Sequence, residues 1–283
     1  MKPLRLAGCV VLAALAIAGI LVLLGAAPGD SRPRTPSGTY GKRLPDLHPA
    51  LPSELSVRID AGVGKARRIL LGFASGGENI GKGPLIVQGY RPNLGQPTLV
   101  ADQIVMLANG QTETVSDVGH FEYVTDPTHQ HFHLLPFMRY ELHKAGSFTL
   151  AVTDRKTGFC LGDRYNVDPG STLPGEPANR VYNTNCGPGT PDLLSLEEGI
   201  SVGWGDNYEP WRDGQYVELT GLPAGKYVLV HRVNPGRRLL ESKYTNNASS
   251  LLLRLTWPKG KNWVPRIKVL KRCPNTARCP APS

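Results

Sequence analysis

The chain has 283 residues, 40% of them hydrophobic, which is enough to bury the core of one large domain or two small ones. It contains 32 glycines and 25 prolines without low-complexity runs, which favours many turns between short strands over long helices. The charged fraction of 19% excludes coiled coils and charge-rich disorder, and the net charge of +9 bears on the surface and its partners, not on the fold.

The N-terminal segment differs from the rest of the chain. Lys2 and Arg5 precede an uncharged apolar run from Leu6 to Ala27, a pattern typical of an export signal. The run is also long enough to cross a bilayer as a helix. Residues 1–27 are therefore predicted to be a cleaved signal peptide or a retained membrane anchor, and the Pro-rich residues 28–55 a flexible stalk. The fold is expected outside the cytoplasm, secreted or held at the membrane by the N-terminal helix.

Short apolar or alternating stretches bounded by Gly, Asn or Asp follow from Ser56 onward and predict strands. They cover residues 68–73, 84–88, 103–107, 120–124, 140–142, 148–152, 215–219, 226–231 and 249–256. No segment has the period of an amphipathic helix, and residues 163–196 are predicted to form a long irregular loop. The expected fold is all-β, an antiparallel β-sandwich with long irregular loops behind the N-terminal signal or anchor helix. The sandwich is assigned to residues 56–260, and residues 261–283 to a C-terminal tail.

Four cysteines lie outside the N-terminal segment: Cys160, Cys186, Cys273 and Cys279. An even number in an exported chain predicts two disulfides, with free buried thiols as the alternative. Three pairings are possible. The short separation of Cys273 and Cys279 favours a small disulfide-closed loop in the tail, which leaves Cys160 to pair with Cys186.

Three of the seven histidines alternate along one short segment, at His129, His131 and His133. On a strand, side chains at this spacing share one face, whereas Phe132 would point toward the core. Three neutral imidazoles with an open coordination position describe a catalytic site for Cu(II) or Zn(II), and the spacing does not choose between these metals. The alternative is a surface histidine cluster without a function.

The histidine segment and several later segments, taken in order, resemble the catalytic domain of the lysyl oxidase family. The later segments are Arg139–Leu142, Arg155–Leu161, Gly199–Tyr208, Gln215–Leu219, Pro223–Pro235 and Glu241–Asn247. The resemblance covers roughly residues 56–256. It implies that His129, His131 and His133 are Cu(II) ligands and that Lys156 and Tyr208 form the family's self-derived cofactor, lysine tyrosylquinone. Trp204 stands where animal members have a cysteine, and Arg139 where they have a histidine; these departures concern substrate preference more than the cofactor.

The resemblance implies a copper-dependent amine oxidase. Such an enzyme converts a primary amine, including a peptidyl lysine, to an aldehyde, consuming O₂ and releasing ammonia and hydrogen peroxide. A quinone carbonyl supplies the electrophile that unmodified side chains lack, and a base must remove the α-proton of the amine. Asp206 lies two residues before Tyr208 and faces the same way on an extended chain, which makes it the candidate base. The alternative is a turn residue in Gly-Asp-Asn.

The acidic residues near Tyr208 in the sequence are expected to attract a cationic amine to a basic protein. They are Glu197, Glu198, Asp206 and Glu209. The basic remainder of the surface indicates either a solvated face or a surface for acidic wall polymers or lipid headgroups.

Two further hypotheses remain open. The first is a non-catalytic, exported, metal-binding β-sandwich of the adhesion type, because Leu219–Asn247 also resembles the last hairpin of such modules. The second is a metal-dependent enzyme without a quinone. No nucleic-acid motif is present, and the sequence does not indicate an oligomeric state.

Overall fold

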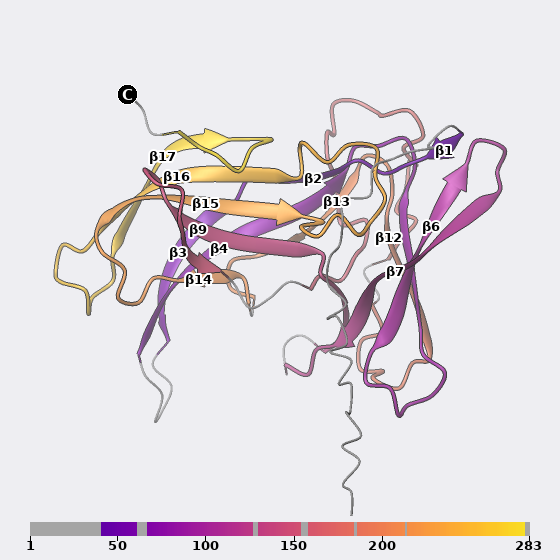
Figure 1. The fold of residues 1–283 in the computed structure, drawn as a ribbon, viewed down its shortest axis with the longest axis horizontal. Coiled ribbons are helices and arrows are strands. Elements are labelled where there is room, and N and C mark those ends of the chain that lie inside the picture. Colours follow the sequence, from indigo (N-terminus) through magenta and orange to yellow (C-terminus); the bar gives the residue numbers. More distant parts are fainter. Residues whose placement is uncertain are drawn as a thin grey trace, which may run out of the picture. The chain divides into compact units, whose positions relative to one another are not determined.

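The computed structural model describes residues 41–60, 67–126, 130–153, 158–183, 186–212 and 214–280. In this part of the chain the regular secondary structure consists of seventeen β-strands, paired antiparallel throughout, and this confirms the predicted all-β, antiparallel class (Figure 1). The predicted signal or anchor helix, residues 1–27, and the first part of the predicted stalk lie outside the described residues. No helix long and apolar enough to span a bilayer occurs among the residues described.

The first sheet carries the predicted histidine segment at one edge. Its strand order is β12-β5-β6-β7-β8, and β1 pairs with β6. The strands are β1 (Lys42–Arg43), β5 (Leu85–Tyr90), β6 (Leu99–Leu107), β7 (Thr112–Tyr123), β8 (Phe132–Leu135) and β12 (Ser195–Ile200).

The second sheet has the order β10-β9-β15-β16-β17. Its strands are β9 (Met138–Lys144), β10 (Leu150–Thr153), β15 (Gly225–Val233), β16 (Ala248–Thr256) and β17 (Arg266–Cys273).

The third sheet is built around one long strand, β4 (Arg68–Asn79), which pairs with four others. Its order is β11-β13-β4-β14, and β2 and β3 also pair with β4. The other strands of this sheet are β2 (Leu47–Pro49), β3 (Ser53–Asp60), β11 (Tyr165–Asn166), which pairs with β13, β13 (Trp204–Tyr208) and β14 (Tyr216–Glu218). Strand β13 ends at the predicted cofactor tyrosine, so β4 fixes the position of Tyr208.

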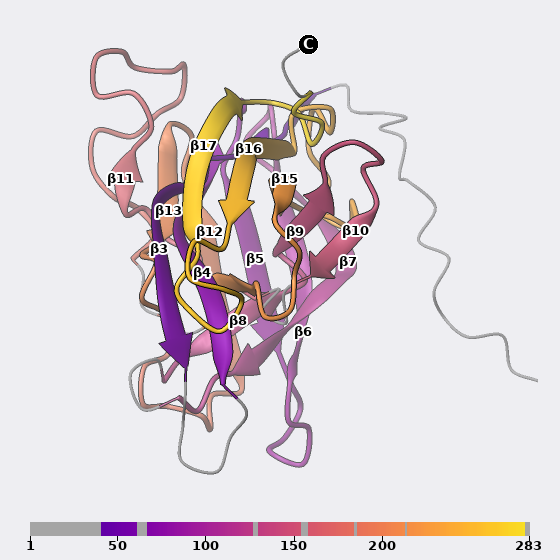
Figure 2. The ribbon, with the colours of Figure 1, turned by 90° about the vertical axis from the view of Figure 1, so that its left-hand side faces the viewer.

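The second and third sheets pack face to face (Figure 2). The ring of Phe73 on β4 meets Tyr140 on β9 edge to face at 4.9 Å between centroids, and the Tyr140 hydroxyl lies 2.7 Å from the hydroxyl of Ser75. Apolar side chains from all three sheets join one core cluster, in which Phe73, Phe121, Phe132 and Leu229 are fully buried. Burial of this cluster supplies the main driving force for folding.

Two sequence-based boundaries are wrong in the structure. Residues 42–55 do not form a stalk, because Leu47 is fully buried in the core and the β2 and β3 segments pair with β4. Residues 266–273 are not a separate tail, because β17 pairs along β16. The disulfide Cys273–Cys279 forms at the end of β17, as the sequence favours.

Candidate functional site

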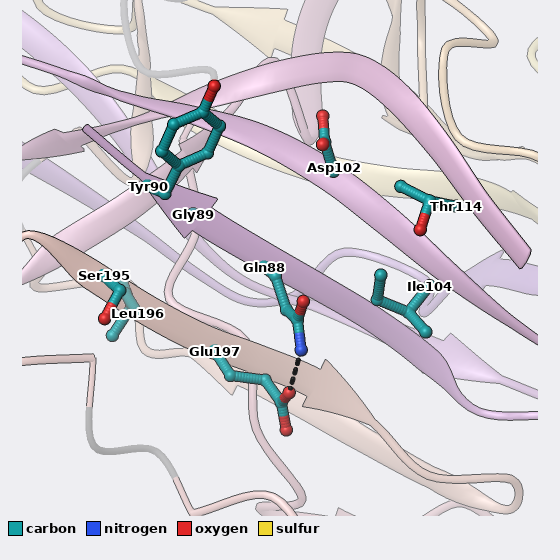
Figure 3. Close-up of a pocket in the computed structure, with 9 residues that line it drawn as sticks. All are labelled: Gln88, Gly89, Tyr90, Asp102, Ile104, Thr114, Ser195, Leu196 and Glu197. Carbon is teal, nitrogen blue, oxygen red and sulfur yellow. Dashed lines mark hydrogen bonds between the residues drawn. The ribbon is translucent and has the colours of Figure 1, made fainter. Parts of the chain in front are cut away.

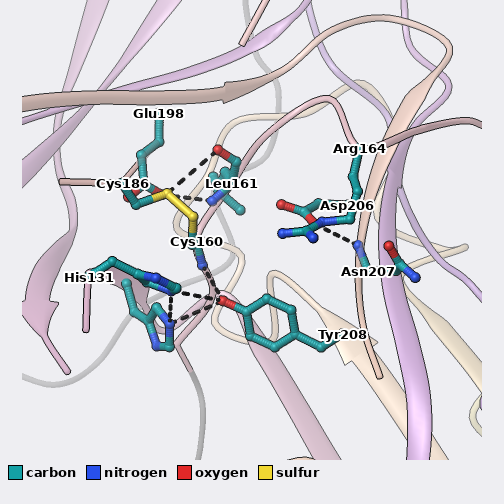
Figure 4. The surroundings of a disulfide bond; sticks show 10 residues. His131, Cys160, Leu161, Arg164, Cys186, Glu198, Asp206, Asn207 and Tyr208 are labelled. Atoms are coloured by element: carbon teal, nitrogen blue, oxygen red, sulfur yellow. Dashed lines mark hydrogen bonds and ion pairs between the residues drawn. A yellow bond between two sulfur atoms is a disulfide. The ribbon is translucent and has the colours of Figure 1, made fainter. Parts of the chain in front are cut away.

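Three polar side chains from two segments far apart in the sequence converge at the edge of the first sheet (Figure 4). Nε2 of His131 lies 3.0 Å from Nε2 of His133, and the hydroxyl of Tyr208 lies 3.4 Å and 3.1 Å from these two nitrogens. His133 and Tyr208 are buried, and His131 is partly exposed. The two imidazoles therefore share one face, and the phenol on β13 points at both of them.

Backbone hydrogen bonds on both sides hold the histidine segment in place. The amide of Val124 on the β7 side donates to the carbonyl of His131 at 2.9 Å, and the amide of Phe132 donates to the carbonyl of Cys186 at 2.8 Å. Phe132 points the other way and is fully buried, as the alternation predicts. The histidines thus project from a backbone whose hydrogen bonds are satisfied, so their side chains are pre-positioned.

The spacing of the two imidazoles fits a shared metal ion. Two nitrogens bound to one ion at about 2.0 Å lie about 2.8 Å apart at a right angle and about 3.3 Å apart at the tetrahedral angle. The observed 3.0 Å between His131 and His133 falls between these limits. Neutral imidazoles are good ligands for Cu(II) and Zn(II), so the donor set also suits these metals.

Tyr208 occupies a closed, ordered environment. Its ring stacks on Phe159, with 3.9 Å between centroids and 21° between the ring planes, and the amide of Cys160 donates a hydrogen bond of 3.2 Å to its hydroxyl. Burial raises the pKa of the phenol well above its usual value, and the nearby carboxyls of Asp206 and Glu198 raise it further. The phenol is therefore kept neutral in the absence of a metal.

Asp206 is fully buried on β13 and is held through one oxygen only. Its Oδ1 accepts hydrogen bonds from Nε of Arg164 and from the amide of Asn207, both at 2.7 Å. Its Oδ2 has no hydrogen-bond partner among the described residues. Burial raises the pKa of Asp206 to about 7, although the Arg164 cation opposes this. A carboxyl with one oxygen anchored, the other available and a pKa near neutrality is suited to accept a proton.

Of the four acidic residues expected around Tyr208, Asp206 and Glu198 are buried near the site, whereas Glu197 and Glu209 are not buried. Glu198 is buried near the site; one of its oxygens accepts a 2.8 Å hydrogen bond from the amide of Leu161, and burial raises its pKa well above the usual value. Glu209 is partly exposed and pairs with Arg212 at 2.9 Å. Glu197 does not face the site, because successive residues of β12 point to opposite sides of the sheet.

Glu197 instead lines an open hollow of about 600 Å³ over β5, β6 and β12, where it accepts a hydrogen bond from Gln88 at 2.8 Å (Figure 3). Tyr90, Asp102 and Ile104 line the same hollow. The predicted site residues that the structure describes, His131, His133, Asp206 and Tyr208, do not line it.

A disulfide links the segment that precedes the long loop to the loop itself. Cys160 pairs with Cys186, as the sequence favours, and the amide of Cys160 is the donor to Tyr208. Glu198 lies near both sulfurs, but the disulfide consumes them, so this group is not a metal site.

Buried Asp163 fastens the long loop close to this disulfide. Its carboxylate accepts hydrogen bonds from the amides of Val181, Tyr182 and Ser201. The loop beside the site is therefore tied to the core at several points.

Two of the predicted site residues, His129 and Lys156, lie outside the described residues. The structure brings His131, His133 and Tyr208 together and places Asp206 and Glu198 near them. His231 is remote from the histidine pair: its ring is buried against Ala50 and Met138, and burial lowers its pKa to about 4. Sequence reasoning missed Arg164 and Phe159, although Phe159 lies within the resembling segment Arg155–Leu161 and Arg164 follows it by three residues.

Comparison with known proteins places the chain in a family. Residues 98–257, more than half of the chain, match the family model described as lysyl oxidase. The chain belongs to the lysyl oxidase family.

Among its relatives, Lysyl oxidase homolog 2A of Danio rerio is 29% identical over 139 residues, which cover 49% of this chain and 17% of the relative. Lysyl oxidase homolog 2 of Bos taurus is 29% identical over 140 residues, which cover 49% of this chain and 16% of the relative. Lysyl oxidase homolog 3B of Danio rerio is 30% identical over 140 residues, or 49% of this chain and 15% of the relative. The match therefore spans about one sixth of the length of these relatives.

Proposed function

We propose that this protein is a copper-dependent amine oxidase that converts a primary amine, with a peptidyl lysine as one candidate, to an aldehyde. In this proposal His129, His131 and His133 bind Cu(II), and Lys156 and Tyr208 form lysine tyrosylquinone. Family membership supports the class of reaction. The observation that carries the assignment to these residues is the convergence of two imidazole nitrogens and the Tyr208 hydroxyl within 3.4 Å of one another.

Copper and the quinone, when present, supply the oxidation of the amine by O₂ and water to an aldehyde, ammonia and hydrogen peroxide. The residues of the chain hold the reacting groups in position. His131 and His133 would bind the metal beside the hydroxyl of Tyr208. Phe159 restrains the ring plane of Tyr208, and the Cys160 amide restrains its hydroxyl.

Asp206 is the proposed base. Arg164 and the Asn207 amide hold its Oδ1, so a proton from the α-carbon of the amine would be accepted at Oδ2. Its raised pKa brings the carboxyl close to neutral pH, where a general base is most effective. Buried Glu198, whose pKa burial raises well above its usual value, adds a second carboxyl beside the site that can hold a proton.

The proposal includes a location outside the cytoplasm, because the described residues contain two disulfides. Residues 1–27 are proposed to direct export, either as a cleaved signal or as an anchor, and the three sheets, from β1 to β17, to form the catalytic domain.

The decisive experiment is peptide mapping of the copper-loaded protein by mass spectrometry. The proposal expects one joined peptide pair that contains Lys156 and Tyr208, together with peroxide release from primary amines that a copper chelator abolishes. Lys156→Arg should retain copper but lose both the joined peptides and peroxide release. Two separate, unmodified peptides from copper-loaded protein would contradict the quinone. Copper binding without peroxide release would favour a non-catalytic metal-binding module.

A further inference from the structure

The charges of this protein are segregated along the chain. The last 65 residues, 219–283, contain thirteen lysines and arginines and a single acidic residue, Glu241, for a formal charge of +12. The preceding 218 residues contain 19 basic and 22 acidic residues, for a formal charge of −3. Glu241 is fully buried. The basic character of the protein therefore belongs to its C-terminal hairpins, β15 to β17.

Cations in these hairpins lie opposite one another on adjacent strands. Lys226 on β15 is paired with Arg254 on β16, and Arg254 with Lys268 on β17. Residues directly opposite in an antiparallel pair project from the same face, about 5 Å apart, so the three cations form a row across the sheet. Like charges in such positions destabilise a sheet. No carboxylate of the described residues forms an ion pair with any of the three cations. The stability of the fold therefore does not explain why they lie opposite one another.

The connection between β16 and β17 adds exposed apolar groups to these cations. This segment, residues 257–265, is named the β16–β17 tip (Figure 1). Trp263 is 58% exposed and Val264 is 51% exposed. Lys259, Lys261 and Arg266 at or beside the tip are all exposed.

The base of the tip is firmly attached to the protein. Nε1 of Trp257 donates to the carbonyl of Leu222 at 3.0 Å, and the amides of Gly260 and Trp263 donate within the tip. Because these hydrogen bonds hold the loop in place, its exposed indole, valine and cations form a defined surface and not a frayed end.

We propose that the β16–β17 tip, with the cationic row behind it, docks on an anionic lipid surface. Lipid phosphates neutralise the cations, and the interfacial region of a bilayer accepts Trp263 and Val264. A soluble phosphate polymer would satisfy only the cations and leave the two apolar side chains in water. A second copy of this chain would present the same positive charges and be repelled. The proposal is independent of the amine oxidase activity and of residues 1–27.

The test is quenching of tryptophan fluorescence in the full chain by vesicles that contain brominated phosphatidylcholine, with or without phosphatidylglycerol. The expected result is lipid-dependent quenching with the anionic vesicles and little with the zwitterionic ones. Trp263→Phe should remove this quenching. Trp211→Phe is the matched control, because Trp211 is 65% exposed but lies outside the tip, and it should leave the quenching unchanged.

The charge requirement is tested with two double variants of equal net charge. Lys259→Gln with Lys261→Gln removes two cations from the tip, and each is worth about 1 kcal/mol at an anionic surface, so the lipid concentration for half-maximal quenching should rise about 30-fold. Arg237→Gln with Lys243→Gln removes two cations from the opposite end of the β15–β16 hairpin and should leave that concentration unchanged.

Four outcomes would overturn the proposal. The first is vesicle-bound protein whose Trp263 is not quenched, because attachment would then belong to another part of the chain. The second is equal quenching by zwitterionic and anionic vesicles. The third is an equal effect of the two double variants. Absence of any vesicle-dependent quenching would also reject a lipid partner and leave an acidic protein or polymer as the occupant to test.

Discussion

Arg164→Met should destabilise the protein more strongly at alkaline pH than at acidic pH. Arg164 donates to the buried carboxyl of Asp206 at 2.7 Å and is the cation that opposes the burial-driven rise in its pKa. The other charged group beside Asp206 that affects this pKa is Glu209, which raises it. Without Arg164 the pKa of Asp206 should rise above 7, so the variant retains a proton that the wild type releases.

The size of the effect follows from the pKa of Asp206. Because this pKa is raised in the folded state from 3.8 to about 7, its contribution to folding is fully present below pH 3.8 and is lost as pH rises through 7. At pH 5, Asp206 is protonated in both proteins, so the variant loses only a hydrogen bond, worth about 1 kcal/mol. At pH 8.5, Asp206 of the folded wild type is ionised and Arg164 stabilises its charge, whereas Asp206 of the variant keeps its proton. This ionisation stabilises the wild type by about 1.4 kcal/mol per pH unit above the pKa. At pH 8.5 it therefore adds about 2 kcal/mol to the difference in unfolding free energy between wild type and variant.

Thermal unfolding at the two pH values measures this difference. For a chain of this size about 1 kcal/mol corresponds to about 2–4 °C, so the gap in Tm between wild type and variant should widen from roughly 3 °C at pH 5 to roughly 9 °C at pH 8.5. Arg212→Met is the control: it breaks a partly exposed pair with Glu209, and such pairs contribute less than about 1 kcal/mol. A gap for Arg164→Met that is the same at both pH values would refute the reasoning.

Two further predictions concern the same site. Asp206→Asn should retain copper and the joined Lys156–Tyr208 peptides but lower the rate of amine oxidation at least about 100-fold, since general bases contribute about this much; unchanged peroxide release would exclude Asp206 as the base. Removal of the Cys160–Cys186 disulfide by a double alanine substitution should cost about 3.5 kcal/mol of unfolding free energy, given its separation of 26 residues, against about 2 kcal/mol for Cys273 and Cys279, which are separated by 6. Urea unfolding measures both, and equal losses would contradict the loop-length argument.

Local sequence patterns were sufficient to predict most of the strands. The segments at 68–73, 103–107, 226–231 and 249–256 all fall within observed strands, because each alternates or is continuously apolar and ends at turn residues. Pairing was not predictable in the same way. Strand β4 pairs with β14 across a separation of about 150 residues, and no local pattern encodes this partner.

The missed elements have physical reasons. Residues 42–55 have the composition of a linker, yet Leu47 is fully buried and its amide donates to buried Glu241 at 2.9 Å. The burial of Leu44 and Leu47, the pairing of β2 and β3 with β4 and the hydrogen bond to Glu241 together outweigh the local Pro-rich signal there. Strand β17 was missed because its lysines and arginines suggest a solvated tail, whereas its backbone completes the edge of the second sheet.

The site was predictable to the extent that it depends on residue type and spacing. Alternation placed His131 and His133 on one face, and the resemblance named Tyr208. What the sequence could not supply was the burial of Asp206 and Glu198, because their depth depends on how β12 and β13 pack after folding. Arg164 escaped notice for the same reason, since its significance comes from its contact with Asp206, 42 residues away.

The energetics of this site point to chemistry rather than to stability. Asp206 and Glu198 are both buried, each with one oxygen hydrogen-bonded and the other without a hydrogen-bond partner among the described residues. A buried polar atom without a partner costs about 1–3 kcal/mol, and folding would be served better by apolar groups of similar shape. Three stabilising features of the surrounding structure offset this cost: the Cys160–Cys186 disulfide, the Asp163 hydrogen bonds and the aromatic stack on Tyr208. The placing of two acidic groups beside a phenol and two imidazoles, at this cost, supports the proposed proton transfer at Asp206.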